Sequence, residues 1–227
     1  FEVPSSAVTD AHANVPGELV EALVLSAGRV RRFHEACLPK SWIDSSEGYG
    51  EMFNPVNRVG IYVPGGTARF PSTVLMTAIP ARVAGVQEII VATPSGKDGS
   101  PDPVVLAAAD IAGVDRVFQI SGAQAIAALA YGTETVPRVD MVCGPGNVFV
   151  TLAKKLVFGD VGIDGLYGPT ETLVIADGDA NPTLCAADLV AQAEHDYMAT
   201  PVLITTSAEL AEAVQAEAEL RAADLER

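Results

Sequence analysis

Gln192 and His195 stand at the end of an apolar, helix-like run and carry the strongest chemical signal in this chain. Residues three apart lie on one face of a helix, so an amide oxygen and an imidazole nitrogen would be close together there. Such a pair is suited to a divalent metal ion. A zinc site requires about four ligands, and the sequence offers no other convincing one. A helix-end histidine that binds no metal is the competing interpretation.

Three loops that follow predicted strands are the other candidate binding sites. In the segment 62–67, glycines would let the backbone approach a ligand, and amides ahead of a helix favour anions, although a simple turn also needs glycine. Gln124 follows Gly122 and offers both a hydrogen-bond donor and an acceptor. Asn147 follows a Gly-Pro-Gly turn, where it either contacts a ligand or only caps a helix. The G-x-G-x-x-G fingerprint of ordinary dinucleotide sites is absent.

The elements that must position these loops are short β-branched runs that alternate with alanine-rich helical runs. The predicted strands are residues 59–63, 88–93, 117–120, 141–143, 172–176 and 202–205. The predicted helices are residues 71–84, 104–112, 123–131, 148–158, 184–193 and 208 onward. This alternation predicts an α/β fold with two Rossmann-like units, whose parallel sheets are covered by helices. Right-handed crossovers would bring the carboxyl ends of the strands to one rim, where ligands usually bind.

The segment before residue 58 has a different pattern. Apolar residues between Leu19 and Cys37 recur at intervals of three or four, which predicts an amphipathic helix with one stripe facing the core. Pro16 precedes this helix and Pro39 follows it, as is typical of helix boundaries. We interpret residues 41–57, which contain two glycines, as a loop.

Charge and cysteine content exclude several classes of protein. The 227 residues include 14 basic and 29 acidic ones, a formal charge of −15, which argues against binding to nucleic acid or an anionic membrane. No run approaches the roughly 18 apolar residues of a membrane span. The three cysteines lie in unlike contexts, so we expect buried, reduced thiols in a cytoplasmic protein. Because the chain starts without methionine and stops in a charged segment, we expect a fragment of a longer protein.

In this order and spacing, the motifs resemble the first half of histidinol dehydrogenase, from about Glu18 to Thr206. The matching stretches are Gly60–Gly66, Ser121–Leu129, Val136–Val150, Gly168–Ala176 and Ala187–Asp196. That family uses NAD and zinc to oxidise L-histidinol through the aldehyde to L-histidine, in histidine biosynthesis. The resemblance therefore implies NAD and Zn²⁺ as cofactors and a small amino alcohol as substrate. It also implies that Tyr62, Gln124 and Asn147 match the family's NAD-contacting residues.

The resemblance assigns the remaining site residues to the second unit. Thr170 matches a substrate-contacting serine, and Gln192 and His195 match two zinc ligands that also lie against the substrate. The family's general base is a Glu-His pair further along the chain, and the other two zinc ligands, an Asp and a His, also lie there. Glu194 with His195 is not that pair, so we expect no catalytic residue within these 227 residues. The chain alone is expected to be inactive.

The family architecture implies three parts. Residues 1–58 would begin a larger α/β domain, residues 59–166 would form an inserted NAD-binding, Rossmann-like domain, and residues 167–227 would return to the larger substrate and zinc domain. In the family, one zinc ligand comes from the partner subunit of an intertwined dimer. We therefore expect the full-length protein to be a homodimer.

Some positions depart from the family pattern. Tyr167 stands where a small residue is usual, and Tyr197 replaces a frequent proline. Thr170 replaces serine but keeps the hydroxyl, and the pair 69–70 (Arg-Phe) is unusual after the glycine loop. These differences leave open a family relative that oxidises another polar alcohol. A non-catalytic nucleotide-binding or structural module is the third interpretation.

Overall fold

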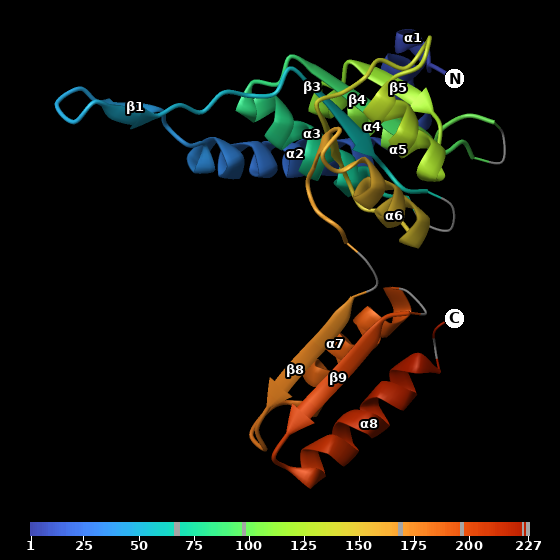
Figure 1. Cartoon of the computed structure of the whole chain (residues 1–227). Helices are drawn as coiled ribbons and strands as arrows, with labels where there is room; N and C mark the ends of the chain where they lie inside the picture. The colour runs from blue at the N-terminus through green and yellow to red at the C-terminus, as the bar shows by residue number, and fades with distance from the viewer. Residues whose placement is uncertain (66–68, 97–98, 168–169, 196–197, 224, 226–227) are drawn as a thin grey trace. The chain divides into compact units, whose positions relative to one another are not determined.

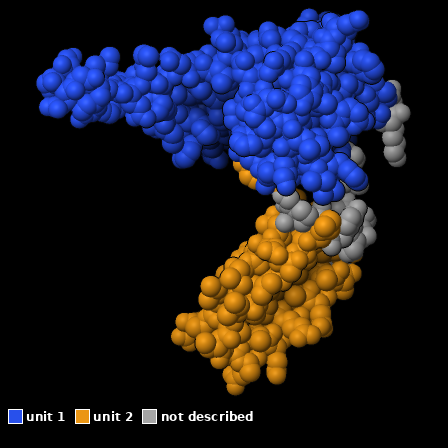
Figure 2. Space-filling model, viewed as in Figure 1, with its two compact units in different colours: residues 1–166 blue, residues 167–227 orange. Residues whose placement is uncertain are grey.

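The chain divides into two compact units, residues 1–166 and residues 167–227, which Figure 2 colours separately. The structure is a computed structural model, and it describes residues 1–65, 69–96, 99–167, 170–195, 198–223 and 225. Each unit combines parallel strands with helices and has a core of its own. The predicted α/β class is confirmed.

Within the described part of unit 1, five parallel strands form one sheet in the order β5-β4-β3-β6-β7 (Figure 1). The strands are β3 (Arg58–Tyr62), β4 (Glu88–Thr93), β5 (Arg116–Gln119), β6 (Met141–Cys143) and β7 (Gly162–Ile163). The first of them, β3, lies in the middle, because β4 and β5 are added on one side and β6 and β7 on the other. Ligands of open α/β sheets bind where the strand order reverses in this way.

Helices cover both faces of this sheet, as the sequence predicts. One core contains α1 (Ser5–Asp10), the 3₁₀ helix η1 (Ala11–Asn14), α2 (Gly17–Cys37), α3 (Pro71–Ala84) and α4 (Pro103–Ala112). The other core contains α5 (Gly122–Tyr131) and α6 (Val148–Val157). Neighbouring residues of β4 alternate between the cores, with Ile89 in the first and Ile90 in the second. Burial on both faces explains why the strands read as continuous apolar runs.

Residues 41–57, predicted to be a loop, contain an antiparallel hairpin, so that prediction is wrong. β1 (Trp42–Asp44) pairs with β2 (Tyr49–Glu51). The Asp44 carboxylate accepts hydrogen bonds from two amides of the connecting turn, at 2.9 and 3.1 Å. Gly48 supplies a positive φ of 76°. Trp42 and Ile43 on one side and Tyr49 on the other side of an Asp- and Gly-containing turn are the sequence signal for this hairpin.

The predicted apolar stripe of α2 reaches the core only in part. Leu23 is buried, whereas Phe33 is 65% exposed and Cys37 is exposed. From residue 35 to residue 57, every residue except Asp44 is exposed. The last turns of α2 and the hairpin therefore form an arm without a core of its own (Figure 1). The prediction of a buried thiol is wrong for Cys37.

Unit 2 contains two parallel strands and two helices within its described residues. They are β8 (Glu171–Ala176), α7 (Pro182–His195), β9 (Thr200–Thr205) and α8 (Ala208–Ala222). A small core, formed by Cys185, Ala186, Leu210 and Val214, lies between the helices and one face of the strand pair. Of the helices in the described part of either unit, none is both long and apolar enough to cross a membrane.

Candidate functional site

The carboxyl ends of β3 and β6 lie side by side at the point where the strand order reverses. Tyr62 ends β3 and is 5% exposed, and Gly144 directly follows β6. A Cβ atom added at Gly144 would lie 2.1 Å from the Tyr62 carbonyl oxygen, and the φ of Gly144 is 110°. Glycine is therefore required for the 144–147 loop to run this close to β3.

Tyr62 also reaches the loop that follows β5. Its hydroxyl accepts a hydrogen bond from the amide of Gly122, the first residue of α5, at 3.2 Å. The exposed side chain of Gln124 folds back toward the same residue, since its Oε1 lies 2.9 Å from the position of a Cβ added at Gly122. The structure thus brings Tyr62 and Gln124, two of the predicted cofactor contacts, to one glycine at the carboxyl edge of the sheet.

Asn147, the third predicted cofactor contact, is the N-cap of α6. Its side-chain oxygen accepts hydrogen bonds from the amides of Phe149 and Val150, both at 3.1 Å. Asn147 therefore caps α6, and its contact with a ligand stays a prediction. Because capping uses the oxygen, a ligand at this helix terminus would meet the side-chain NH₂ group of Asn147.

An ion pair between a buried lysine and a partly exposed aspartate, which no sequence motif reveals, lies beneath this loop. Lys154 of α6 is only 2% exposed, and its Nζ donates to Asp164 Oδ1 and, at 3.0 Å, to the carbonyl oxygen of Gly144. The other oxygen of Asp164 accepts the Gly144 amide at 2.8 Å. Both backbone polar groups of Gly144 are thus bound by one pair of charges. A lysine in an apolar helix beside a lone aspartate gives little sequence signal for such a contact.

Cys143 ends β6 next to this pair. Burial, and secondarily the negative charge of Asp164, raise the pKa of the Cys143 thiol to about 12, although Lys154 opposes the shift. The thiol is therefore protonated near neutral pH. A protonated thiol is a poor nucleophile, which argues against covalent chemistry at Cys143.

We expect alkylation to distinguish the cysteines. At pH 8, a pKa of about 12 leaves about one Cys143 thiol in ten thousand ionised, whereas Cys37 is exposed. Iodoacetamide should therefore modify Cys37 and spare Cys143 in the native chain, as measured by peptide mass spectrometry. In denaturant, both should react. Equal rates of modification in the native chain would contradict the raised pKa.

In unit 2, Gln192 and His195 lie in the last turns of α7, as predicted. The Thr172 hydroxyl of β8 donates to Gln192 Oε1 at 2.9 Å, which orients the amide, and His195 is exposed. The donor set suits zinc, because an amide oxygen has a second lone pair and an imidazole nitrogen is a common zinc ligand. The described residues contain no cluster of three or more His, Cys, Asp or Glu able to hold a metal. Gln192 and His195 alone are fewer than the about four ligands of a zinc site, so a metal role for them stays a prediction.

Two further positions that the sequence singles out, at the start of unit 2, are exposed to solvent. Thr170 is exposed directly before β8, and Tyr167 is 55% exposed. Gly66 and Thr67 of the first glycine loop lie outside the described residues, as does Tyr197.

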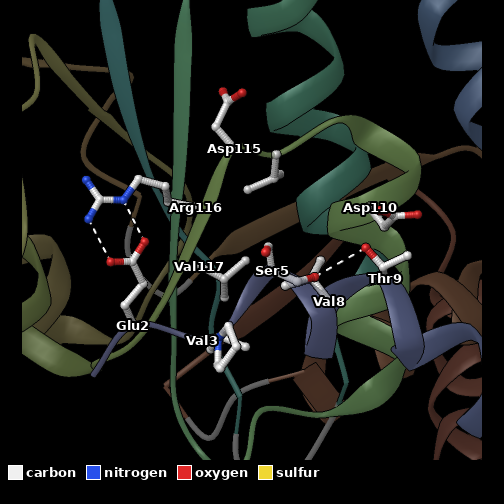
Figure 3. A pocket seen from close by; sticks show the side chains of 11 residues that line it. Glu2, Val3, Ser5, Val8, Thr9, Asp110, Asp115, Arg116 and Val117 are labelled. Carbon is white, nitrogen blue, oxygen red and sulfur yellow. Dashed lines mark hydrogen bonds and ion pairs between the residues drawn. The ribbon is translucent and has the colours of Figure 1, made fainter.

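Two cavities lie at the opposite, amino edge of the sheet. One of about 280 Å³ is lined by the chain start and by the residues that lead into β5, including Glu2, Asp115 and Arg116 (Figure 3). Arg116 and Glu2 form a two-pronged ion pair across it, with both distances 2.7 Å. The other, of about 630 Å³, lies beside the segments that lead into β6 and β7. Neither is lined by a predicted site residue.

The family model that matches this chain and the curated relatives named here agree on one family. The family model described as histidinol dehydrogenase matches residues 1–227. The histidinol dehydrogenase of Dehalococcoides mccartyi is 54% identical over 228 residues, covering 100% of this chain and 52% of the relative. That of Synechococcus sp. is 51% identical over 227 residues, covering 99% of this chain and 52% of the relative.

A solved structure agrees with these relatives. The crystal structure of histidinol dehydrogenase from Elizabethkingia anophelis matches with a TM-score of 0.92 and 37% identity, covering 100% of this chain and 53% of that chain. The chain thus spans about half the length of the relatives that it matches. By its match to the family model over all 227 residues, the chain belongs to the histidinol dehydrogenase family.

Proposed function

We propose that this chain supplies the NAD-binding site and part of the substrate and metal site of an enzyme that oxidises L-histidinol to L-histidine. The observation that carries the proposal is the convergence of Tyr62, Gln124 and Asn147 at the carboxyl edge of a parallel sheet, where the strand order reverses. Residues 59–166 are the proposed NAD-binding domain, and residues 1–58 and 167–227 are proposed parts of a larger domain, of which α1, η1 and α2 pack against α3 and α4 of the NAD-binding domain. The three free cysteines support a cytoplasmic location.

The proposed nucleotide site predicts a specific effect of Asn147→Ser. Serine caps helices about as well as asparagine, so stability should change by less than about 0.5 kcal/mol. The side-chain NH₂ donor is lost, and the dissociation constant for NAD⁺ should rise about threefold to tenfold. Calorimetric titration of the 227-residue chain measures the affinity, and thermal unfolding measures the stability. Unchanged affinity would argue against a nucleotide contact at Asn147.

For the metal and substrate, we propose that Gln192 and His195 are zinc ligands and that Thr170 contacts L-histidinol. The hydrogen bond from Thr172 supports this role, since it fixes the amide of Gln192 as outer partners of metal ligands commonly do. Bound zinc would hold the substrate's amino and imidazole nitrogens, and NAD would accept a hydride from the alcohol carbon. The remaining ligands and the general base would come from protein segments other than this chain.

The assay that tests the proposal compares the full-length parent protein with the isolated chain. With histidinol, NAD⁺ and zinc, the full-length protein should form NADH, and the 227-residue chain should form none. NADH formed only with a different polar alcohol would indicate a family relative of other specificity. NAD⁺ binding without turnover of any alcohol would indicate a non-catalytic module. Turnover of histidinol by the isolated chain would refute its proposed inactivity.

The proposed partner of the full-length protein is a second copy of itself. Eight large apolar side chains of the arm, between Phe33 and Val56, are 37–76% exposed. Half-exposed side chains of this size present on the order of 100 Å² each, so together they match the roughly 800 Å² per partner of a standard interface. A two-stranded hairpin is also only marginally stable alone. A monomeric mass in light scattering of the full-length protein would contradict this proposal.

A further inference from the structure

We propose that Lys154 and Asp164 are positioning residues that hold the 144–147 loop in the shape needed to bind the nucleotide. This inference rests on the proposed NAD-binding function and extends it to two residues that do not themselves contact the ligand. Lys154 lies in α6, and Asp164 directly follows β7, so the pair ties together two elements that end or begin at the rim of the sheet.

The contacts of the pair converge on one residue of the loop. Asp164 Oδ2 accepts the Gly144 amide at 2.8 Å, and Lys154 Nζ donates to the Gly144 carbonyl oxygen at 3.0 Å. Asp164 Oδ1 also accepts the amide of Gly165 at 2.9 Å. With both of its polar groups bound, the peptide planes on either side of Gly144 cannot rotate without losing charge-assisted hydrogen bonds. The backbone of the 144–147 loop therefore has one fixed path where it leaves β6.

That direction matters because the same glycine adjoins Tyr62. The close approach of Gly144 to the Tyr62 carbonyl leaves little space for an alternative path. Three residues later, Asn147 caps α6, the helix that also carries Lys154. The pair thus fixes the loop at its start and the helix terminus at its end, between which the proposed nucleotide contacts lie.

Energetics favour a positioning role over a purely stabilising one. Burial of a lysine that is 2% exposed has a large desolvation cost, and apolar residues of similar size are often at least as stable in such places. An apolar pair would not bind the Gly144 amide and carbonyl. We therefore explain the charged pair at this position by the backbone geometry of Gly144, which the pair holds through two hydrogen bonds.

The structure offers a matched control at the other edge of the sheet. Asp115 Oδ2 accepts the backbone amide of Ile89 and the guanidinium of Arg82, both at 2.7 Å. This carboxylate has the same kinds of partner as Asp164, although its side chain is more exposed, 40% against 23%, and it precedes β5 at the amino edge, away from the proposed site. Asp115→Asn therefore measures the effect of losing a carboxylate that binds an arginine and a backbone amide, with no change at the carboxyl edge of the sheet.

The experiment compares the 227-residue chain with three variants, namely Asp164→Asn, the uncharged pair Lys154→Met/Asp164→Leu, which can neither donate to nor accept from Gly144, and Asp115→Asn. The uncharged pair guards against misfolding, because it leaves no unpaired buried charge. NAD⁺ affinity is measured by calorimetric titration, and the rigidity of residues 144–150 by amide hydrogen exchange with mass spectrometry. In both variants at position 164, the dissociation constant and the exchange rate should rise about tenfold or more. In Asp115→Asn, both should stay within about twofold.

The possible outcomes test the positioning role of the pair and the proposed NAD-binding function separately. Unchanged exchange and unchanged affinity in both variants at position 164 would overturn the positioning role while the proposed function stands. An equal loss of affinity in Asp115→Asn would also overturn it, because general destabilisation would then explain the effect. If the wild-type chain binds no NAD⁺, the proposed function fails and the nucleotide role of the pair fails with it, whereas the exchange rates still show whether the pair holds the loop.

Discussion

Gly144→Ala is expected to destabilise unit 1 by at least about 4 kcal/mol, which is exceptional for a single substitution. The added Cβ would lie 2.1 Å from the Tyr62 carbonyl oxygen and 3.2 Å from the Tyr62 amide nitrogen. Both are backbone atoms of a central strand, so neither can move without breaking the sheet. The φ of 110° adds the penalty that residues with a Cβ incur in this region. Urea unfolding followed by circular dichroism measures the loss.

Gly159→Ala is the matched control for this substitution. Gly159 has a similar φ of 103°, but no atom lies within 4 Å of an added Cβ. The control therefore carries the backbone penalty alone, about 1–2 kcal/mol. The difference between the two variants isolates the steric contact between β3 and the 144–147 loop. Equal losses would show that the loop can retreat from Tyr62, which would contradict a rigid rim.

Lys154→Met is the second change with a large expected effect, a loss of about 2–3 kcal/mol, because Asp164 and the Gly144 carbonyl oxygen both lose their charged donor. Methionine fills the space, but the Asp164 carboxylate keeps its charge and loses its cationic partner. A partly buried charge that has lost its partner is costlier than two neutral groups at the same place. Far-UV circular dichroism during urea unfolding gives the free energy of unfolding of each variant.

The double variant Lys154→Met/Asp164→Asn, in which neither side chain carries a charge, tests the origin of this loss. If the unpaired charge causes it, the double variant should be more stable than Lys154→Met by about 1 kcal/mol or more, so the effects of the substitutions are non-additive. A further loss in the double variant would instead show that the Asp164 carboxylate stabilises the fold through its hydrogen bonds with the amides of Gly144 and Gly165. Neither result depends on the presence of a nucleotide.

Much of the framework follows from sequence periodicity. The predicted bounds of α3, β4 and β6 agree with the structure to the residue, because buried parallel strands and alanine-rich helices leave strong, uninterrupted apolar patterns. The hairpin at 42–51 was predicted as a loop, since its short strands are exposed and lack a clear alternation toward a core. Asn147 was recognised as a possible cap from its place after a Gly-Pro-Gly turn, which is a local signal.

The rest of the site depends on contacts between distant segments. Lys154 and Asp164 are ten residues apart and lie on a helix and a loop, so no local pattern pairs them. The strand order that places β6 beside β3, and thereby Gly144 against Tyr62, arises from the crossovers and not from either strand's composition. The raised pKa of the Cys143 thiol likewise reflects burial and neighbouring charges that are set by this packing.

By itself, the sequence determined the α/β class, most of the helices and strands, the candidate residues and the family, because these depend on local periodicity and on motifs in a fixed order. Only the tertiary structure decided that Tyr62 and Gln124 meet at Gly122, that an ion pair with a buried lysine holds Gly144, and that residues 35–57 form an exposed arm. These features depend on which segments pack together and which remain in solvent. That outcome is set by the free energy of the whole fold and not by any one stretch of residues.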